Sequence, residues 1–264
     1  MYEFDYQRPA SVNDAARLAG GDVRYLAGGQ SLIQSMKLRL ASAPTLVDLG
    51  AIADLRFIKV DGTTVSIGAM TTHSTVARSK EVIAAIPALA ELAGGIGDPM
   101  VRNLGTIGGS LANADPAACY PSAVLALDAT IHTNQRKIPA GDFFKGLFET
   151  ALQPGEMIVS VSFPIVKQAA YQKLKQPASR FALVGVFVAN GPSGPRVAVT
   201  GAGPTVFRVT EMETALKSKF SADAIANVKV PAAGLNSDLH GSAEYRAAMI
   251  TVMAQRAVTA ALAR

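Results

Sequence analysis

Two glycine-rich segments constrain this chain more than any other feature of its sequence. Residues 27–31 read Ala-Gly-Gly-Gln-Ser, and residues 105–110 read Gly-Thr-Ile-Gly-Gly-Ser. Each segment ends in a hydroxyl residue and runs into apolar sequence. Glycine lets a backbone come close to a ligand and take a positive φ, and exposed N–H groups then form a concave site for an anion. The pair predicts two loops that hold one phosphate-rich ligand, and the alternative is two unrelated structural turns.

Composition favours a folded protein and argues against a nucleic acid as its ligand. Of the 264 residues, 49% are hydrophobic and 17% are charged, which supports a sizeable core and argues against disorder. The formal net charge is +5, but the basic residues are scattered and no basic helix or aromatic ladder accompanies them. We therefore expect no nucleic acid as ligand, because an anionic cofactor or an acidic partner surface explains the same charge.

The residues that usually bind metals or form disulfides are few. Cys119 is the only cysteine, so the chain can form neither an internal disulfide nor a four-cysteine cluster, and it fits a reducing compartment. Its three histidines are far apart in sequence, and we interpret each as a surface or capping residue. We predict no metal site. The first residues resemble no signal peptide, and no apolar run is long enough to span a membrane, so we expect a cytoplasmic protein.

Other phosphate-binding and nucleophilic motifs are missing from the sequence. No string matches the Gly-x-x-x-x-Gly-Lys-Ser/Thr loop or the Gly-x-Ser-x-Gly elbow. Residues 201–203 read Gly-Ala-Gly after an expected strand, but the third glycine and helix start of a dinucleotide fingerprint do not follow. We interpret them as a hairpin turn, which leaves the two glycine segments as the main candidate site.

The order of expected elements indicates an α+β chain in two parts. The first part is expected to contain helices over 11–20, 71–76, 81–93 and 121–129 and strands over 24–27, 45–49, 56–60, 64–68, 129–133, 137–138 and 157–163. Gly20 and Gly21 are expected to stop the first helix, and 32–40 has no assigned structure. The second part is expected to contain strands over 170–174, 182–190, 196–200 and 206–209 and helices over 210–217, 221–227 and 242–263.

The glycine segments and their flanks resemble a known family. Residues 27–32 followed by Met-Lys-Leu-Arg at 36–39 resemble the first FAD motif of the molybdenum hydroxylase flavoproteins, and residues 106–116 resemble the second. This family comprises the medium subunit of carbon monoxide dehydrogenase and its relatives and the FAD domain of xanthine dehydrogenase. The resemblance covers the whole chain and includes Arg102-Asn103 and the segment 171–175.

The resemblance implies a fold and its division into domains. An FAD-binding fold of the vanillyl-alcohol-oxidase (PCMH) type would occupy residues 1–166, with α/β subdomains over about 1–57 and 58–166. A C-terminal α/β domain of the carbon monoxide dehydrogenase flavoprotein type would occupy residues 167–264.

The resemblance also implies a set of FAD-binding residues. Residues 27–31 and 106–110 would clasp the diphosphate, with apolar neighbours and residues near the flavin completing the set: Ala27, Gly28, Gly29, Gln30, Ser31, Leu32, Val101, Thr106, Gly108, Gly109, Ser110, Asp115, Lys173 and Phe181. Core packing is the alternative role for Phe181. Two positions depart from the family, since Gln30 replaces a histidine and Cys119 replaces a carboxylate that helps to hold FAD.

The implied function is electron transfer within a larger complex. A molybdopterin-binding large subunit would oxidise the substrate, a small subunit would carry two-iron two-sulfur clusters, and this chain would pass electrons from its FAD to an external acceptor. A dimer of such heterotrimers is expected. No catalytic acid or base is needed, because the redox chemistry belongs to the cofactor. The alternatives are a stand-alone FAD oxidase and a flavin-free structural subunit.

Overall fold

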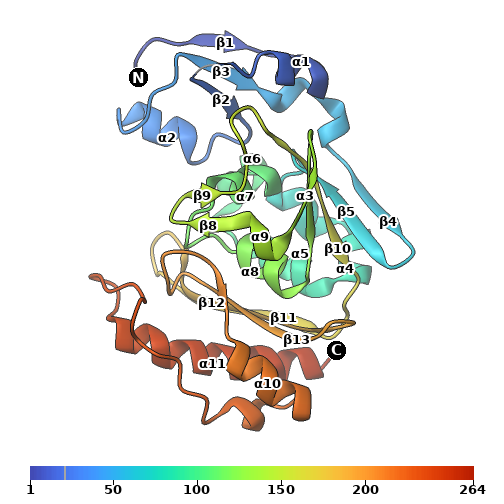
Figure 1. Ribbon diagram of the computed structural model, residues 1–264, viewed down its shortest axis with the longest axis vertical. Coiled ribbons are helices and arrows are strands. Elements are labelled where there is room, and N and C mark those ends of the chain that lie inside the picture. The colour runs from blue at the N-terminus through green and yellow to red at the C-terminus, as the bar shows by residue number, and fades with distance from the viewer. Residues whose placement is uncertain (21) are drawn as a thin grey trace.

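The computed structural model describes residues 1–20 and 22–264 and arranges them in three units, stacked in chain order in Figure 1. The first unit contains a three-stranded sheet, the middle unit a five-stranded sheet and the last unit a four-stranded sheet. A small sheet of β8 (Phe144–Gly146) and β9 (Glu149–Thr150) belongs to the middle unit. Within the described ranges, no helix has the length and apolar character that crossing a membrane requires.

Parallel strand pairing holds the first unit together. β3 (Thr45–Asp48) lies between β1 (Asp5–Gln7) and β2 (Val23–Leu26) and is parallel to both. Helix α1 (Val12–Arg17) begins as predicted, because Ser11 Oγ accepts a hydrogen bond from the Asp14 amide. It ends before the expected position, and Gly21 lies outside the described residues. The other elements are α2 (Leu32–Lys37) and the 3₁₀ turns η1 (Leu49–Ala51) and η2 (Ala53–Leu55).

An antiparallel sheet forms the middle unit, and its central strand comes from the end of the unit. The strand order is β4 (Ile58–Asp61), β5 (Thr64–Gly68), β10 (Ile158–Pro164), β6 (Thr130–Thr133) and β7 (Lys137–Pro139). Apolar side chains of the sheet share one core with the helices that connect β5 to β6. The helices are α3 (His73–Arg78), α4 (Lys80–Ala85), α5 (Pro87–Gly94), α6 (Pro99–Leu104), α7 (Ile107–Asn113), α8 (Tyr120–Ala126) and, after β7, α9 (Ala140–Phe143).

The last unit is an antiparallel sheet whose long strand is buried on both faces. Its strands run in the order β11 (Ala169–Lys175), β12 (Ala182–Gly191), β13 (Gly194–Thr200) and β14 (Phe207–Arg208), and its helices are α10 (Thr210–Ser218), the 3₁₀ turn η3 (Ala222–Ile225) and α11 (Ala243–Leu262). Alternate residues of a strand point to opposite faces. Val184 and Val186 accordingly pack with α10 and α11, whereas Phe187 and Ala189 join the core of the middle unit.

The chain passes from the middle unit to the last unit between β10 and β11. Val166 and Ala169, at this passage, belong to the same core cluster as Phe187 and Ala198 of the last sheet. The two units therefore share apolar packing across their junction, although their sheets are separate. The division at residue 166 stays a prediction.

The expected elements exist, but the second glycine segment is not a loop. Asp98 Oδ1 accepts a hydrogen bond from the Val101 amide and begins α6, with Pro99 in its first turn. Thr106 Oγ1 accepts one from the Gly109 amide and begins α7. Gly108 and Gly109 thus lie inside a short helix. Two further expectations were too long, since the strand expected over 206–209 is only Phe207–Arg208 and the helix expected over 221–227 is a 3₁₀ turn.

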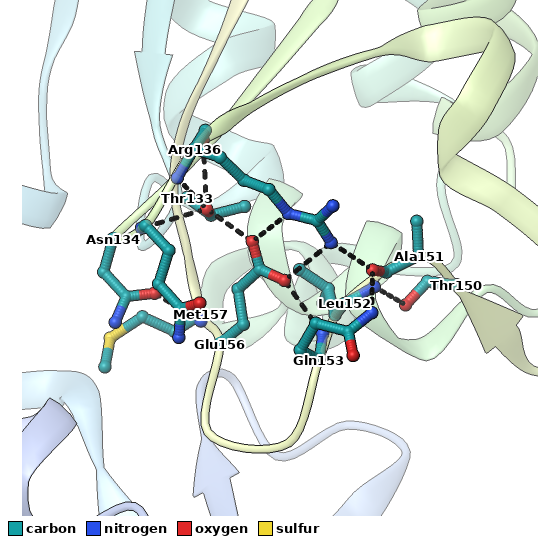
Figure 2. A network of polar contacts seen from close by, with 10 residues as sticks. Thr133, Asn134, Arg136, Thr150, Ala151, Leu152, Gln153, Glu156 and Met157 are labelled. Carbon is teal, nitrogen blue, oxygen red and sulfur yellow. Dashed lines mark hydrogen bonds and ion pairs between the residues drawn. The ribbon is translucent and has the colours of Figure 1, made fainter.

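A buried carboxylate ties the loop before β10 to the turn between β6 and β7 (Figure 2). Glu156 is 4% exposed and accepts hydrogen bonds from Arg136 Nε (2.9 Å), Thr133 Oγ1 (2.7 Å) and the Gln153 amide (2.8 Å). The Arg136 guanidinium also donates to Ala151 O at 2.6 Å. These hydrogen bonds, first the one from Arg136, lower the pKa of Glu156 to about 2.

This network predicts a pH-dependent contribution to stability. Because the pKa of Glu156 is lower in the folded than in the unfolded chain, the unfolded chain binds more protons at acid pH. The stabilisation is complete above about pH 4.5 and is lost as the pH falls towards about 2. We expect Glu156→Gln to lower the free energy of unfolding at neutral pH by on the order of 2 kcal/mol. Urea denaturation should show the gap between the two proteins closing with acidification, and a gap independent of pH would contradict the prediction.

Candidate functional site

A cavity of about 570 Å³ brings the three units together at one place. It is lined by every residue that the sequence placed at the FAD site: Ala27, Gly28, Gly29, Gln30, Ser31, Leu32, Val101, Thr106, Gly108, Gly109, Ser110, Asp115, Lys173 and Phe181. Residues of the first unit, helices of the middle unit and the start of the last unit each contribute. The sequence prediction therefore named residues that the fold gathers around a single space.

The two glycine segments touch each other. A Cβ on Gly28 would lie 2.2 Å from Leu104 O and 2.8 Å from Gly105 Cα, so only glycine permits this approach of the two backbones. At a second contact, a Cβ on Gly109 would lie 3.2 Å from Ala27 Cβ. Gly28 is required where one segment packs against the other, and Gly109 is tightly packed there.

Most amides of the second segment already have acceptors within the protein, which corrects the expectation that both segments offer free N–H groups. Ile107 N donates to Thr71 O at 3.1 Å, Gly108 N to Ala69 O at 2.9 Å, and Gly109 N to Thr106 Oγ1 at 3.1 Å. Gly108 also lacks room for a side chain, because its Cβ would lie 2.8 Å from Ala69 O. The second segment therefore offers the cavity few free N–H groups, together with the Ser110 side chain.

The first segment keeps its donors free. Gly29 has a φ of +69°, and the amides of residues 29–32 find no acceptor among the described residues. Ser31 precedes α2 without a side-chain capping bond, and Gln30 donates from Nε2 to Gly28 O at 3.3 Å. Consecutive N–H groups around a residue of positive φ form a site for an anion. This part of the cavity matches the prediction made from the glycines.

A lysine from the last unit supplies a cation to the cavity. Lys173 Nζ donates to Gly95 O at 2.8 Å and to Arg180 O at 2.9 Å, and it lies 3.5 Å from Cys119 Sγ. Cys119 is buried, with 5% of it exposed. Phe181 follows in the chain, and its ring meets that of His240 edge to face at 5.6 Å.

Sequence reasoning missed His73, which also lines the cavity. It was interpreted as a surface or capping residue, but only 5% of it is exposed, because α3 packs against α5 and α6. Burial, and then Arg102, lower its pKa to about 4. The helix expected over 71–76 includes His73, yet no local signal marks the packing that buries this residue. Of the other histidines, His132 is half-buried beside Ser162, and His240 is exposed.

Two tyrosines lie next to Cys119, which lines the cavity. The hydroxyls of Tyr120 and Tyr171 are enclosed and have no hydrogen-bond partner in the described part of the chain. Burial raises the pKa of both phenols, and the neighbouring Cys119 raises them further. Both phenol hydroxyls therefore stay protonated at neutral pH.

The cavity is built for binding rather than for acid–base chemistry. Its donors and its lysine suit an anion, and Leu32, Val101 and Phe181 provide apolar surface. One lining carboxylate, Glu156, is neutralised by Arg136, and another, Asp115, accepts the Ala117 amide at 2.8 Å. The described residues contain no cluster that could hold a metal ion. These features fit a large ligand with a phosphate part and an apolar ring, such as FAD.

Comparison with known proteins gives a consistent result. The family model "FAD binding domain in molybdopterin dehydrogenase" matches residues 2–166. The chain is 38% identical to the carbon monoxide dehydrogenase medium chain of Hydrogenophaga pseudoflava, over 99% of this chain and 98% of that one. It is 34% identical to the nicotine 6-hydroxylase medium subunit of Paenarthrobacter nicotinovorans, over 98% and 97%. Reconstituted CO dehydrogenase from Oligotropha carboxidovorans matches in structure with a TM-score of 0.91, 36% identity and coverage of 100% and 99%.

The contact between the segments predicts a large effect of one methyl group. Gly28→Ala places a Cβ against the main chain of α6, which cannot move as a flexible side chain can. We expect the free energy of unfolding to fall by about 1–3 kcal/mol. Gly141→Ala is the matched control, because nothing lies within 4 Å of a Cβ at that position. Denaturant unfolding of the two variants should separate them, and equal stability would show that the segments do not pack as closely as described.

Proposed function

Since this chain belongs to the family of FAD-binding domains in molybdopterin dehydrogenases, we propose that it is the electron-transfer subunit of a molybdenum-containing hydroxylase. Its cofactor is FAD, and the predicted α+β FAD-binding fold is confirmed. In the proposed role, the subunit takes electrons from iron–sulfur clusters and passes them to an external acceptor. The observation that carries the proposal is the meeting of both glycine segments at one cavity without a paired acid and base.

The described residues divide the work of holding FAD. The free amides of residues 29–32, with Ser31 and Ser110, suit the diphosphate, and Lys173 adds a positive charge. Apolar side chains, among them Leu32 and Phe181, suit the flavin ring. When bound, FAD supplies the redox chemistry. The chain's own part is to bind the cofactor, orient it and exclude water from it.

The proposed partners are a molybdopterin-binding large subunit and a small subunit with two-iron two-sulfur clusters. Two curated relatives are named as a medium chain or a medium subunit, which implies larger and smaller partners. With one cysteine, this chain cannot hold such clusters itself. A dimer of heterotrimers is the assembly that we propose, and the cytoplasmic location stays a prediction.

The first experiment tests the cofactor and its placement. We expect the purified protein to be yellow and to release FAD on denaturation. Gly109→Leu should weaken FAD binding by about a hundredfold or more, because the side chain would enter the cavity between Thr106 and Ala27. Gly141→Leu is the matched control at an open position. A colourless wild-type protein would favour the flavin-free structural alternative, and Gly109→Leu with full FAD content would refute the placement.

A turnover assay separates electron transfer from the stand-alone oxidase. The FAD-loaded chain alone should oxidise no small organic substrate, whereas its flavin should be reduced once the two partner subunits and their substrate are added. Substrate oxidation by the isolated chain would overturn the electron-transfer proposal.

Cys119 gives a second way to test the site. A carboxylate at this position would lie beside Lys173 Nζ, which is 3.5 Å from Cys119 Sγ, and the family resemblance assigns such an acid to FAD binding. We therefore expect Cys119→Asp to bind FAD about fivefold to tenfold more tightly than the wild type, an effect of about one hydrogen bond. Cys119→Ser is the uncharged control. Equal affinity of the two variants, measured by flavin fluorescence, would contradict the expectation.

A further inference from the structure

His73 faces the cavity but has no part in the contacts assigned so far. The main chain locks it against the second glycine segment, since His73 N donates to Gly105 O at 2.9 Å and the preceding Thr72 forms a bridge with Thr106. Its ring lies 5.4 Å from that of Tyr120. The imidazole is therefore held in one place from both sides.

The two ring nitrogens of His73 have different surroundings. Nδ1 is enclosed and has no hydrogen-bond partner in the described part of the chain. Nε2 lies on the side of Gly105, where a Cβ would come within 2.6 Å of it, and the backbone of Gly105 lines the cavity. Only glycine at position 105 leaves room for this nitrogen beside the cavity.

The surroundings keep the ring uncharged. An imidazolium needs an acceptor for each of its two N–H groups, and Nδ1 has none. Burial is the larger cause of the lowered pKa of His73, and the positive charge of Arg102 on α6 lowers it further. Carboxylates on the neighbouring helices are engaged elsewhere, because Glu81 of α4 accepts from a serine and Glu91 of α5 pairs with Arg264. The single proton of the neutral ring can meet an acceptor only from Nε2.

We propose that neutral His73 donates a hydrogen bond from Nε2–H to an oxygen of bound FAD, an inference that rests on the proposed function. The acceptor is a phosphate oxygen or a flavin carbonyl oxygen, which share the same chemistry. His73 is then a cofactor-positioning residue whose contribution does not change with pH above about 5, well clear of its lowered pKa. It complements Gln30, another residue of the cavity lining with a side-chain N–H group.

Binding measurements on matched variants test the donor. His73→Gln keeps an N–H donor, and His73→Phe keeps a ring against Tyr120 but removes it. By flavin fluorescence, we expect His73→Phe to bind FAD about tenfold more weakly and His73→Gln to stay within about threefold of the wild type. Thermal unfolding checks that both variants fold. Unchanged affinity of a folded His73→Phe would overturn this inference alone, whereas wild-type protein that binds no FAD would remove the proposed function itself.

The same variants identify the acceptor. ADP-ribose carries the diphosphate without the flavin ring. A parallel loss of ADP-ribose and FAD affinity in His73→Phe supports a phosphate acceptor, and a loss confined to FAD supports a flavin carbonyl.

Nitrogen NMR of the wild-type protein gives a test that needs no variant. With ¹⁵N-labelled histidine, His73 should be neutral and protonated on Nε2 from about pH 8 down to about pH 5, and its Nε2 signal should shift when FAD is added. An imidazolium at neutral pH, or a proton on Nδ1, would overturn the inference.

Discussion

The close contact between Gly28 and the Leu104–Gly105 main chain is the constraint on which the site depends. It leaves no room for a Cβ on Gly28, and it brings a turn of the first unit against the helices of the middle unit. The cavity is then lined by the free amides of the first segment and by the second segment, most of whose amides already have acceptors. The glycines are therefore needed first for packing between segments, and the space for a ligand is a consequence of that packing. An interpretation of these glycines only as a phosphate-binding loop leaves out their role in packing the two segments together.

Local signals in the sequence predicted most of the fold. Caps such as Ser11 and turn residues placed the elements well, and the expected hairpin at 201–203 joins two antiparallel strands. The second segment was expected to be a loop because its glycines allow close backbone approach and a positive φ, yet Thr106 caps a helix there. The capping residues of α6 and α7 are legible in the sequence. The hydrogen bond of the Gly108 amide cannot be predicted from the sequence, because its acceptor, Ala69 O, is brought there by the sheet.

The candidate site was predictable to the extent that family motifs carry it. The expected FAD residues line one cavity, although their individual roles stay predictions. His73 could not be found, because its burial comes from helices α5 and α6, which follow α3 in the chain and pack on it only in the fold. Lone histidines are ordinary surface residues in sequence, and only tertiary structure separates one that faces a cavity.

The strand buried on both faces, β12, has a consequence for how a cofactor reaches the site. Phe187 and Ala189 bind the last unit into the middle core, while Val184 and Val186 anchor the same strand to the helices behind it. Swinging the last unit away would expose Phe187, Ala189 and the apolar residues of the middle unit that pack with them, so opening the chain at residue 166 would cost the free energy of that buried contact. The side of the cavity that carries Lys173 is then fixed relative to the middle unit. A cofactor must therefore enter through the existing opening of the cavity, or be bound while the chain folds.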